Sequence, residues 1–142
     1  MTVLQQTFPA QEARVQFLDE LYQTAHALLA DPESSATAVE RAYVQIARRN
    51  AAGRKWTRAE YYAVLVGEVR RLRSGSLART AAADNEILTR LRQLPAGQAE
   101  VTVLHDGQGF TYSEIHRILD IPLKTVGELL TLGRSALSSA VQ

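Results

Sequence analysis

The sequence of 142 residues contains no cysteine, and this absence excludes two kinds of site. Without thiols the chain can form neither a disulfide framework nor a metal centre built on thiolates. Its three histidines, His26, His105 and His116, fall on separate segments with no carboxylate at ligand spacing. Metal sites need several such ligands at defined spacing. We therefore predict no metal site and no cofactor.

Long apolar runs are also absent. Nowhere do about 18 apolar residues follow one another, and residues 1–12 lack the charged start and apolar stretch of an export signal. The sequence has no glycine-rich phosphate loop, no nucleophile elbow and no pair of acids suited to catalysis. We expect a cytoplasmic protein that is not an enzyme, with no catalytic residues, no small-molecule substrate and no membrane contact.

A strand signal is missing as well, because apolar residues recur every three or four positions and not in alternation. An apolar content of 46% in this length can bury one ordinary core or two small ones. The predicted fold class is all-α, with two small helical domains at residues 1–73 and 84–142. Residues 74–83 form a short linker that reaches at most about 35 Å when fully extended. We expect this short linker to keep the two domains packed together.

Three helices are predicted in the first domain. The first follows Pro9 and ends at Asp31-Pro32, and the second ends near Gly53. The third begins at Thr57, which has Glu60 three residues later as in a capping box, and ends at Ser74-Gly75-Ser76. Their apolar faces comprise Leu18, Leu21, Tyr22, Ala25, Leu28 and Leu29, then Val39, Ala42, Tyr43 and Ile46, and then Tyr61, Leu65, Val69 and Leu72.

A helix-turn-helix is predicted within Phe110 to Leu137. Thr111 and Glu114 have capping-box spacing, and Pro122 disfavours helix before it while suiting the start of a new one. Asp120 stands at the turn, where left-handed backbone geometry is common and aspartate tolerates it better than most residues. The second helix carries one apolar face made of Leu123, Val126, Leu130 and Leu137.

Basic residues are concentrated in the middle third of a chain whose net charge is only +1. Residues 1–47 carry two basic and six acidic side chains (−4), residues 48–79 nine and two (+7), and residues 80–142 five and seven (−2). Such a block is the footprint of a phosphate-contacting surface; the alternative is an ordinary solvated helix face. The candidate DNA-binding residues are Arg48, Arg49, Arg54, Lys55, Arg58, Arg70, Arg71 and Arg73.

The C-terminal motif resembles the promoter-reading domain of bacterial RNA polymerase sigma factors, especially the extracytoplasmic-function group. The matching residues are Leu94-Pro95, Val103-Leu104, Tyr112 to Ile115, Ile118-Leu119, Ile121-Pro122, Thr125-Val126, Arg134 and Leu137. The N-terminal part looks like the polymerase-binding, DNA-melting domain of the same family. The residues that carry this second resemblance are Leu28-Leu29-Ala30-Asp31-Pro32 and Ala38-Val39-Glu40-Arg41-Ala42-Tyr43.

This resemblance implies RNA polymerase core and DNA as partners. It implies a helix-turn-helix site at Thr111, Ser113, Arg117, Lys124, Thr125 and Arg134. It also places Trp56, Tyr61 and Tyr62 near the aromatic residues with which the family stacks on flipped bases. Core packing is the alternative role, especially for Tyr61.

Several positions differ from the family pattern. Ser34 to Thr37 replace the acidic residues that help to bind polymerase, and Glu40-Arg41 replaces Gln-Glu. His116 stands where a small alanine is usual, which requires either a wider helix crossing or an outward-turned imidazole. The reading helix has few cations, and Gly127 and Gly133 each cost it about 1 kcal/mol relative to alanine.

The last helix also has a second apolar stripe, made of Leu129, Leu132 and Ala136. A helix this broadly apolar requires burial on more than one side. Packing against the chain's own N-terminal domain, a protein-contact surface and DNA contact are the three alternatives.

Two functions follow from the sequence. One is a sigma factor-like transcription regulator that binds DNA with RNA polymerase in transcription initiation. The alternative is a degenerate sigma-fold protein that acts through contacts with a protein regulator or as a homodimer, without promoter recognition.

Overall fold

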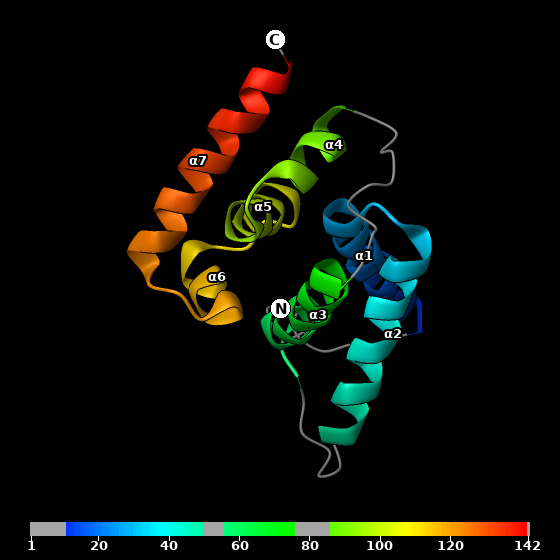
Figure 1. Cartoon of the computed structure of the whole chain (residues 1–142). Helices are drawn as coiled ribbons and strands as arrows, with labels where there is room; N and C mark the ends of the chain where they lie inside the picture. The colour runs from blue at the N-terminus through cyan, green and yellow to red at the C-terminus, as the bar shows by residue number, and fades with distance from the viewer. Residues whose placement is uncertain (1–10, 50–55, 76–85, 142) are drawn as a thin grey trace.

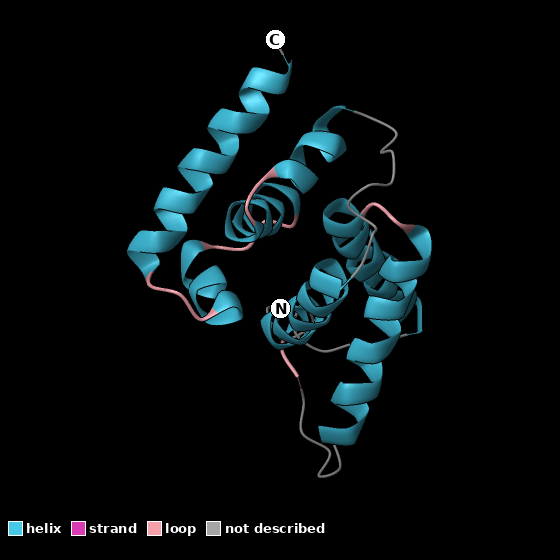
Figure 2. Ribbon diagram, in the orientation of Figure 1, coloured by secondary structure: helices cyan, strands magenta, loops and turns pink. Residues whose placement is uncertain are grey.

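The computed structural model describes residues 11–49, 56–75 and 86–141, and these residues are helical throughout apart from short turns. The helices are α1 (Gln11–Leu29), α2 (Pro32–Arg49), α3 (Arg58–Gly75), α4 (Glu86–Gln93), α5 (Ala96–Thr102), α6 (Tyr112–Leu119) and α7 (Leu123–Val141). A π-helical turn, η3 (Val103–Gly107), continues α5. Figure 2 shows helices joined by short loops, with no strand in the described ranges, which confirms the predicted fold class.

The helix ends follow local signals in the sequence. Helix α1 ends at Leu29, because Ala30 has a left-handed φ of 57°, and Pro32 opens α2. The Asp31 carboxylate accepts the backbone N–H of Ser34 at 2.8 Å, which caps α2. Hydrogen bonds from the Ser34 side chain and from the Ser34 backbone N–H lower the pKa of Asp31. The predicted ends at Pro9, Gly53 and Ser76 lie outside the described residues.

Both predicted capping boxes are present. The Thr57 hydroxyl accepts the Glu60 N–H at 3.2 Å, and the Glu60 carboxylate accepts the Thr57 N–H at 2.8 Å. Thr111 and Glu114 make the same reciprocal pair at the start of α6. In each box, two backbone N–H groups that have no partner within the helix thus gain a hydrogen bond.

The turn of the helix-turn-helix also forms as predicted. Asp120 adopts a left-handed φ of 56°, and its N–H bonds to the His116 carbonyl. The His116 side chain is exposed, and its Nδ1 lies 2.6 Å from the Ile121 carbonyl oxygen. The imidazole therefore turns outward and helps to close the end of α6.

One hydrophobic cluster joins the two halves of the chain. Helix α3 packs on α1 and α2 and also on α6, and α1 contacts α4 and η3 (Figure 1). At the junction the ring of Phe110 meets the ring of Tyr62 edge-on at 4.8 Å, and both side chains are fully buried. The expectation that the halves pack together is met in this structure.

Helix α7 packs mainly against α4, α5 and α6. The alternative in which α7 packs on the N-terminal domain is therefore wrong. Val126 and Leu130 are buried as predicted, but Leu123, the first residue of α7, is 50% exposed.

A glycine allows α7 to approach α5 closely. A Cβ atom at Gly133 would lie 2.2 Å from the Thr102 hydroxyl oxygen and 3.1 Å from the Gln98 carbonyl oxygen. The close crossing therefore requires that Gly133 has no side chain, and its low helix propensity is the accompanying cost.

Candidate nucleic-acid interface

The block of basic residues divides into two groups in the structure. Arg48 and Arg49 at the end of α2 and Arg71 on α3 are exposed. Arg58, Arg70 and Arg73 instead contact the C-terminal half, and Arg54 and Lys55 lie outside the described residues. The sequence block is therefore not one continuous surface.

Arg70 makes a bidentate contact between the halves. Its guanidinium donates twice to the Glu100 carboxylate of α5, through Nε at 2.8 Å and Nη2 at 2.7 Å. The Glu100 side chain is only 1% exposed. This bidentate pair raises the pKa of Arg70 and compensates a buried carboxylate.

Arg58 and Arg73 contact the C-terminal half through backbone carbonyls. Arg73 Nη2 donates to the carbonyl oxygens of Arg92 at 3.0 Å and Leu94 at 2.9 Å, where α4 ends. Burial lowers the pKa of Arg73. Arg58 donates to the Gln108 carbonyl at 3.0 Å, and its guanidinium carbon lies 4.2 Å from the centroid of the Phe110 ring.

A carboxylate of α1 completes the Arg58 contact. The Glu20 carboxylate accepts from Arg58 Nε at 2.8 Å and from the Tyr62 hydroxyl at 2.6 Å. Burial, together with the bond to Glu20, raises the pKa of Tyr62. Three arginines of the predicted DNA-binding block thus hold the two halves of the chain together.

The aromatic residues proposed for base stacking belong to the core. Trp56 and Tyr62 are buried, and Tyr61 packs edge-on against both Phe17 and Trp56. None of the three presents a free ring face of the kind that base stacking requires. Of the two alternatives for these residues, core packing agrees with the structure.

The helix-turn-helix presents few cations. Thr111 is used in the cap of α6, Arg117 lies 3.5 Å from the Ser113 hydroxyl, and Thr125 is partly buried. On α7 the cations are Lys124 and Arg134, with Glu128 exposed between them.

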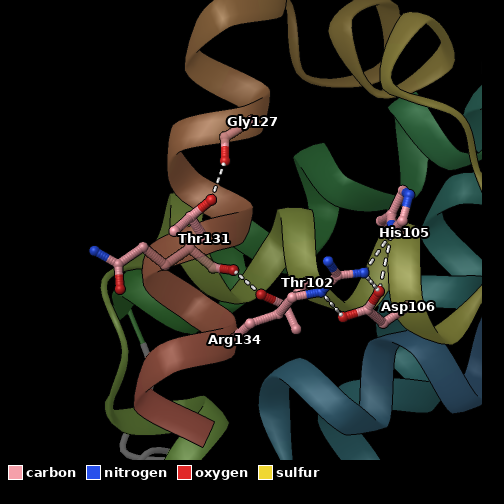
Figure 3. A network of polar contacts seen from close by, with 7 residues as sticks. Thr102, His105, Asp106, Gly127, Thr131 and Arg134 are labelled. Atoms are coloured by element: carbon pink, nitrogen blue, oxygen red, sulfur yellow. Dashed lines mark hydrogen bonds and ion pairs between the residues drawn. The ribbon is translucent and has the colours of Figure 1, made fainter. Parts of the chain in front are cut away.

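Arg134 is paired within the chain. Its Nε and Nη2 donate to Asp106 at 2.9 and 2.5 Å, and the Asp106 carboxylate also contacts His105 Nδ1 at 2.9 Å (Figure 3). The hydrogen bonds from Arg134 lower the pKa of Asp106 to about 2. A phosphate would have to compete with this carboxylate for Arg134.

The three residues named as a protein-contact surface have different environments. Leu129 is partly buried, and its Cδ1 would lie 3.3 Å from a Cβ atom at Gly97 of α5. Ala136 is also partly buried against the core, whereas Leu132 is 53% exposed. Only Leu132 of the three is free for an external contact of any size.

Two buried carboxylates were missed by sequence reasoning. Glu100 lies in a buried run that continues through Leu104, and Glu68 lies on α3 between the buried Leu65 and Val69. An acid within an apolar stripe is the signal that could have revealed Glu68. In the described parts of the chain no group of three or more histidine or acidic residues could hold a metal ion, and no helix is long and apolar enough to span a membrane.

Two comparisons with known proteins bear on this arrangement. Residues 84–137 match the family described as Sigma-70, region 4. These residues form a sigma-70 region 4 domain. The helix-turn-helix, its left-handed turn at Asp120 and most of α7 therefore lie within this region 4 match.

The sigma factor likeness extends over most of the chain. The structure superimposes on the sigma factor RpoE of Bartonella quintana, solved in complex with the anti-sigma factor NepR, with a TM-score of 0.74. The two share 18% identity, and the match covers 92% of this chain and 95% of that one. No curated protein sequence matches the chain. The region 4 match and this fold support the resemblance to sigma factors, and a sigma factor-like transcription regulator agrees with both.

Proposed function

We propose that this sigma factor-like regulator contacts DNA through the outer surface of α2 and α3 and not through its reading helix. The proposal rests on the distribution of exposed cations. Arg41, Arg48, Arg49 and Arg71 are exposed along the line where α2 meets α3. Helix α7 offers only Lys124 and the paired Arg134. Because phosphate contacts dominate affinity for nucleic acid, the α2–α3 surface is the better polyanion partner.

In this proposal residues 1–73 and residues 84–142 have different roles, as the two domains of sigma factors do. The first part approaches RNA polymerase core and DNA, and the second positions it through the contacts of Arg58, Arg70 and Arg73. We assign it no catalytic activity.

A second candidate function, binding of a protein regulator, is favoured by an apolar groove between α1 and α2. The groove has a volume of about 680 Å³ and is lined by Leu18, Asp19, Tyr22, Ala36, Val39, Glu40, Tyr43 and Val44. Leu18 is 39% and Val44 is 44% exposed in it. Since the structurally similar RpoE was solved bound to an anti-sigma factor, a protein partner for this chain is a reasonable proposal.

Salt-dependent DNA binding tests the first proposal. In the variant Arg41→Gln, Arg48→Gln, Arg49→Gln, the slope of log affinity against log salt should fall by about 0.7 to 0.9 for each phosphate that is no longer neutralised. The matched control, Arg117→Gln, Lys124→Gln, Arg134→Gln, removes the same charge from the helix-turn-helix and should leave the slope nearly unchanged. A larger effect in the control would reverse the assignment.

A pull-down with purified RNA polymerase core separates the two candidate functions. Retention of the chain by core supports the sigma factor role. Absence of retention, together with salt-insensitive DNA binding, would leave the protein-regulator function.

A further inference from the structure

Glu100 of the C-terminal half interacts with two arginines of α3. Its carboxylate is 1% exposed and accepts Arg70 Nε at 2.8 Å and Arg70 Nη2 at 2.7 Å. Burial lowers the pKa of Arg73, and the negative charge of Glu100 opposes this shift. One buried carboxylate of α5 is therefore shared by two cations that the sequence assigned to DNA binding.

The Arg70–Glu100 pair has the geometry of a phosphate contact. A guanidinium group binds a carboxylate or a phosphate through the same two parallel N–H donors. The Arg70 side chain is 49% exposed, so it can be reached from solvent although Glu100 occupies its Nε and Nη2 donors. Arg71, the next residue of α3, is 74% exposed on the surface that we propose to contact DNA. Glu100 therefore occupies donors that lie one residue from this surface.

Arg73 is also occupied by the C-terminal half. Its Nη2 donates to two backbone carbonyl oxygens at the end of α4, at 3.0 and 2.9 Å. A phosphate group carries a full negative charge that a carbonyl oxygen lacks, so it attracts a cation more strongly. Arg58 differs, because its ion pair with Glu20 lies within the N-terminal half and does not depend on how the halves pack. The packing of the two halves, here called the closed arrangement, therefore withholds Arg70 and Arg73 from DNA.

We infer that the closed arrangement is autoinhibitory: Glu100 takes the place of a DNA phosphate at Arg70, and separation of the halves releases Arg70 and Arg73 to the DNA backbone. The inference rests on the proposed DNA contact by α2 and α3 and adds its regulation. The two released cations join Arg71 on the same helix, which increases the positive charge that α3 presents to a polyanion. Because DNA and Glu100 compete for the same donors, DNA binding itself favours separation of the halves.

Salt-dependent binding of a labelled DNA duplex, measured by fluorescence anisotropy, tests the role of Glu100. Glu100→Gln removes the competing charge, so this variant should bind more tightly than the unmodified protein. The slope of log affinity against log salt should steepen by about 1.8, as expected for two additional phosphate contacts. The control Glu86→Gln removes the same charge from an exposed position of the same half and should change the slope much less. A Glu100→Gln variant that is folded by circular dichroism and binds like the control overturns the inference.

A distance measurement that leaves Glu100 in place provides a second test, which does not depend on the folding of the Glu100 variant. The sequence has no cysteine, so Ala47→Cys on α2 and Ser138→Cys on α7, both at exposed positions, attach a donor and an acceptor dye to the two halves. Saturation with the duplex at low salt should lower the efficiency of energy transfer, and high salt should restore it. Donor-only samples control for a direct effect of DNA on the dye. An unchanged transfer efficiency in the DNA-bound protein overturns the inference.

Together the two measurements separate autoinhibition from the proposed function. If the unmodified protein binds the duplex with strong salt dependence while the transfer efficiency stays constant, autoinhibition fails and the proposed DNA contact stands. If neither the unmodified protein nor Glu100→Gln binds the duplex, the proposed DNA contact itself fails. Tighter binding by Glu100→Gln together with a DNA-dependent fall in transfer efficiency supports both.

Discussion

Arg70 and Arg71 are neighbours in sequence and opposite in environment. Arg70 points to the C-terminal half and forms a bidentate pair with the buried Glu100, whereas Arg71 is 74% exposed on the α2–α3 surface. Charge density along the chain cannot separate the two. Arg71 also has a carboxylate partner, since its Nη1 lies 3.6 Å from Glu68 of the same helix, but only the Arg70–Glu100 pair is bidentate and joins the two halves. The difference teaches that the geometry of a cation's pairing, and not its place in a basic block, decides how much it stabilises the fold.

The largest expected difference is in the free energy of unfolding between variants at Arg70 and at Arg71. Arg70→Ala leaves the Glu100 carboxylate buried and unpaired, which typically costs about 3 to 5 kcal/mol. Arg71 is 74% exposed and its single contact with Glu68 is 3.6 Å long, so Arg71→Ala should cost less, within about 1 kcal/mol. Chemical denaturation of the two variants under identical conditions measures both values. Similar stabilities would show that the Arg70–Glu100 contact does not hold the halves together in solution.

The difference in stability between substitutions at Leu129 and at Leu132 is expected to be smaller. Leu129 packs on α5 at Gly97, so Leu129→Arg should lose about 1.5 to 3 kcal/mol of stability. Leu132→Arg adds a cation at an exposed site and should alter stability by only a few tenths of a kcal/mol. Thermal melts give the stabilities, and a gel shift on the same samples shows whether a cation on α7 increases DNA affinity. Increased affinity in the Leu132 variant would indicate that α7 does approach DNA.

The smallest expected effect is the pH dependence of the stability that the Asp106–Arg134 pair contributes. The folded-state pKa of Asp106 is lowered to about 2, below its usual 3.8, so the carboxylate contributes stability above pH 4. That contribution should disappear as the pH falls through about 2. Compared with Asp106→Asn, the unmodified protein should therefore be more stable at pH 7 and nearly equal at pH 2. A constant difference in melting temperature across this range would exclude the carboxylate charge as its cause.

Local structure was predictable from sequence because its causes are local. The caps at Thr57 and Thr111 and the left-handed turn at Asp120 each depend on residues within four positions. The partners of Arg58, Arg70 and Arg73 lie 19 to 50 positions away and come from the packing of the two halves. The same holds for Gly133, whose role depends on Thr102. The fold class could therefore be predicted, but the division of the basic block could not.

The shared core around Tyr62 and Phe110 limits how freely the two halves can be exchanged between relatives. A chimera that joins these N-terminal helices to a different region 4 domain would replace Phe110, Gln108 and Glu100 together. Arg58 and Arg70 would then lose the partners that they have in this structure. Exchange of the halves therefore requires the junction residues on both sides to be transferred as one set, so the boundary between modules in sequence is not a boundary in packing.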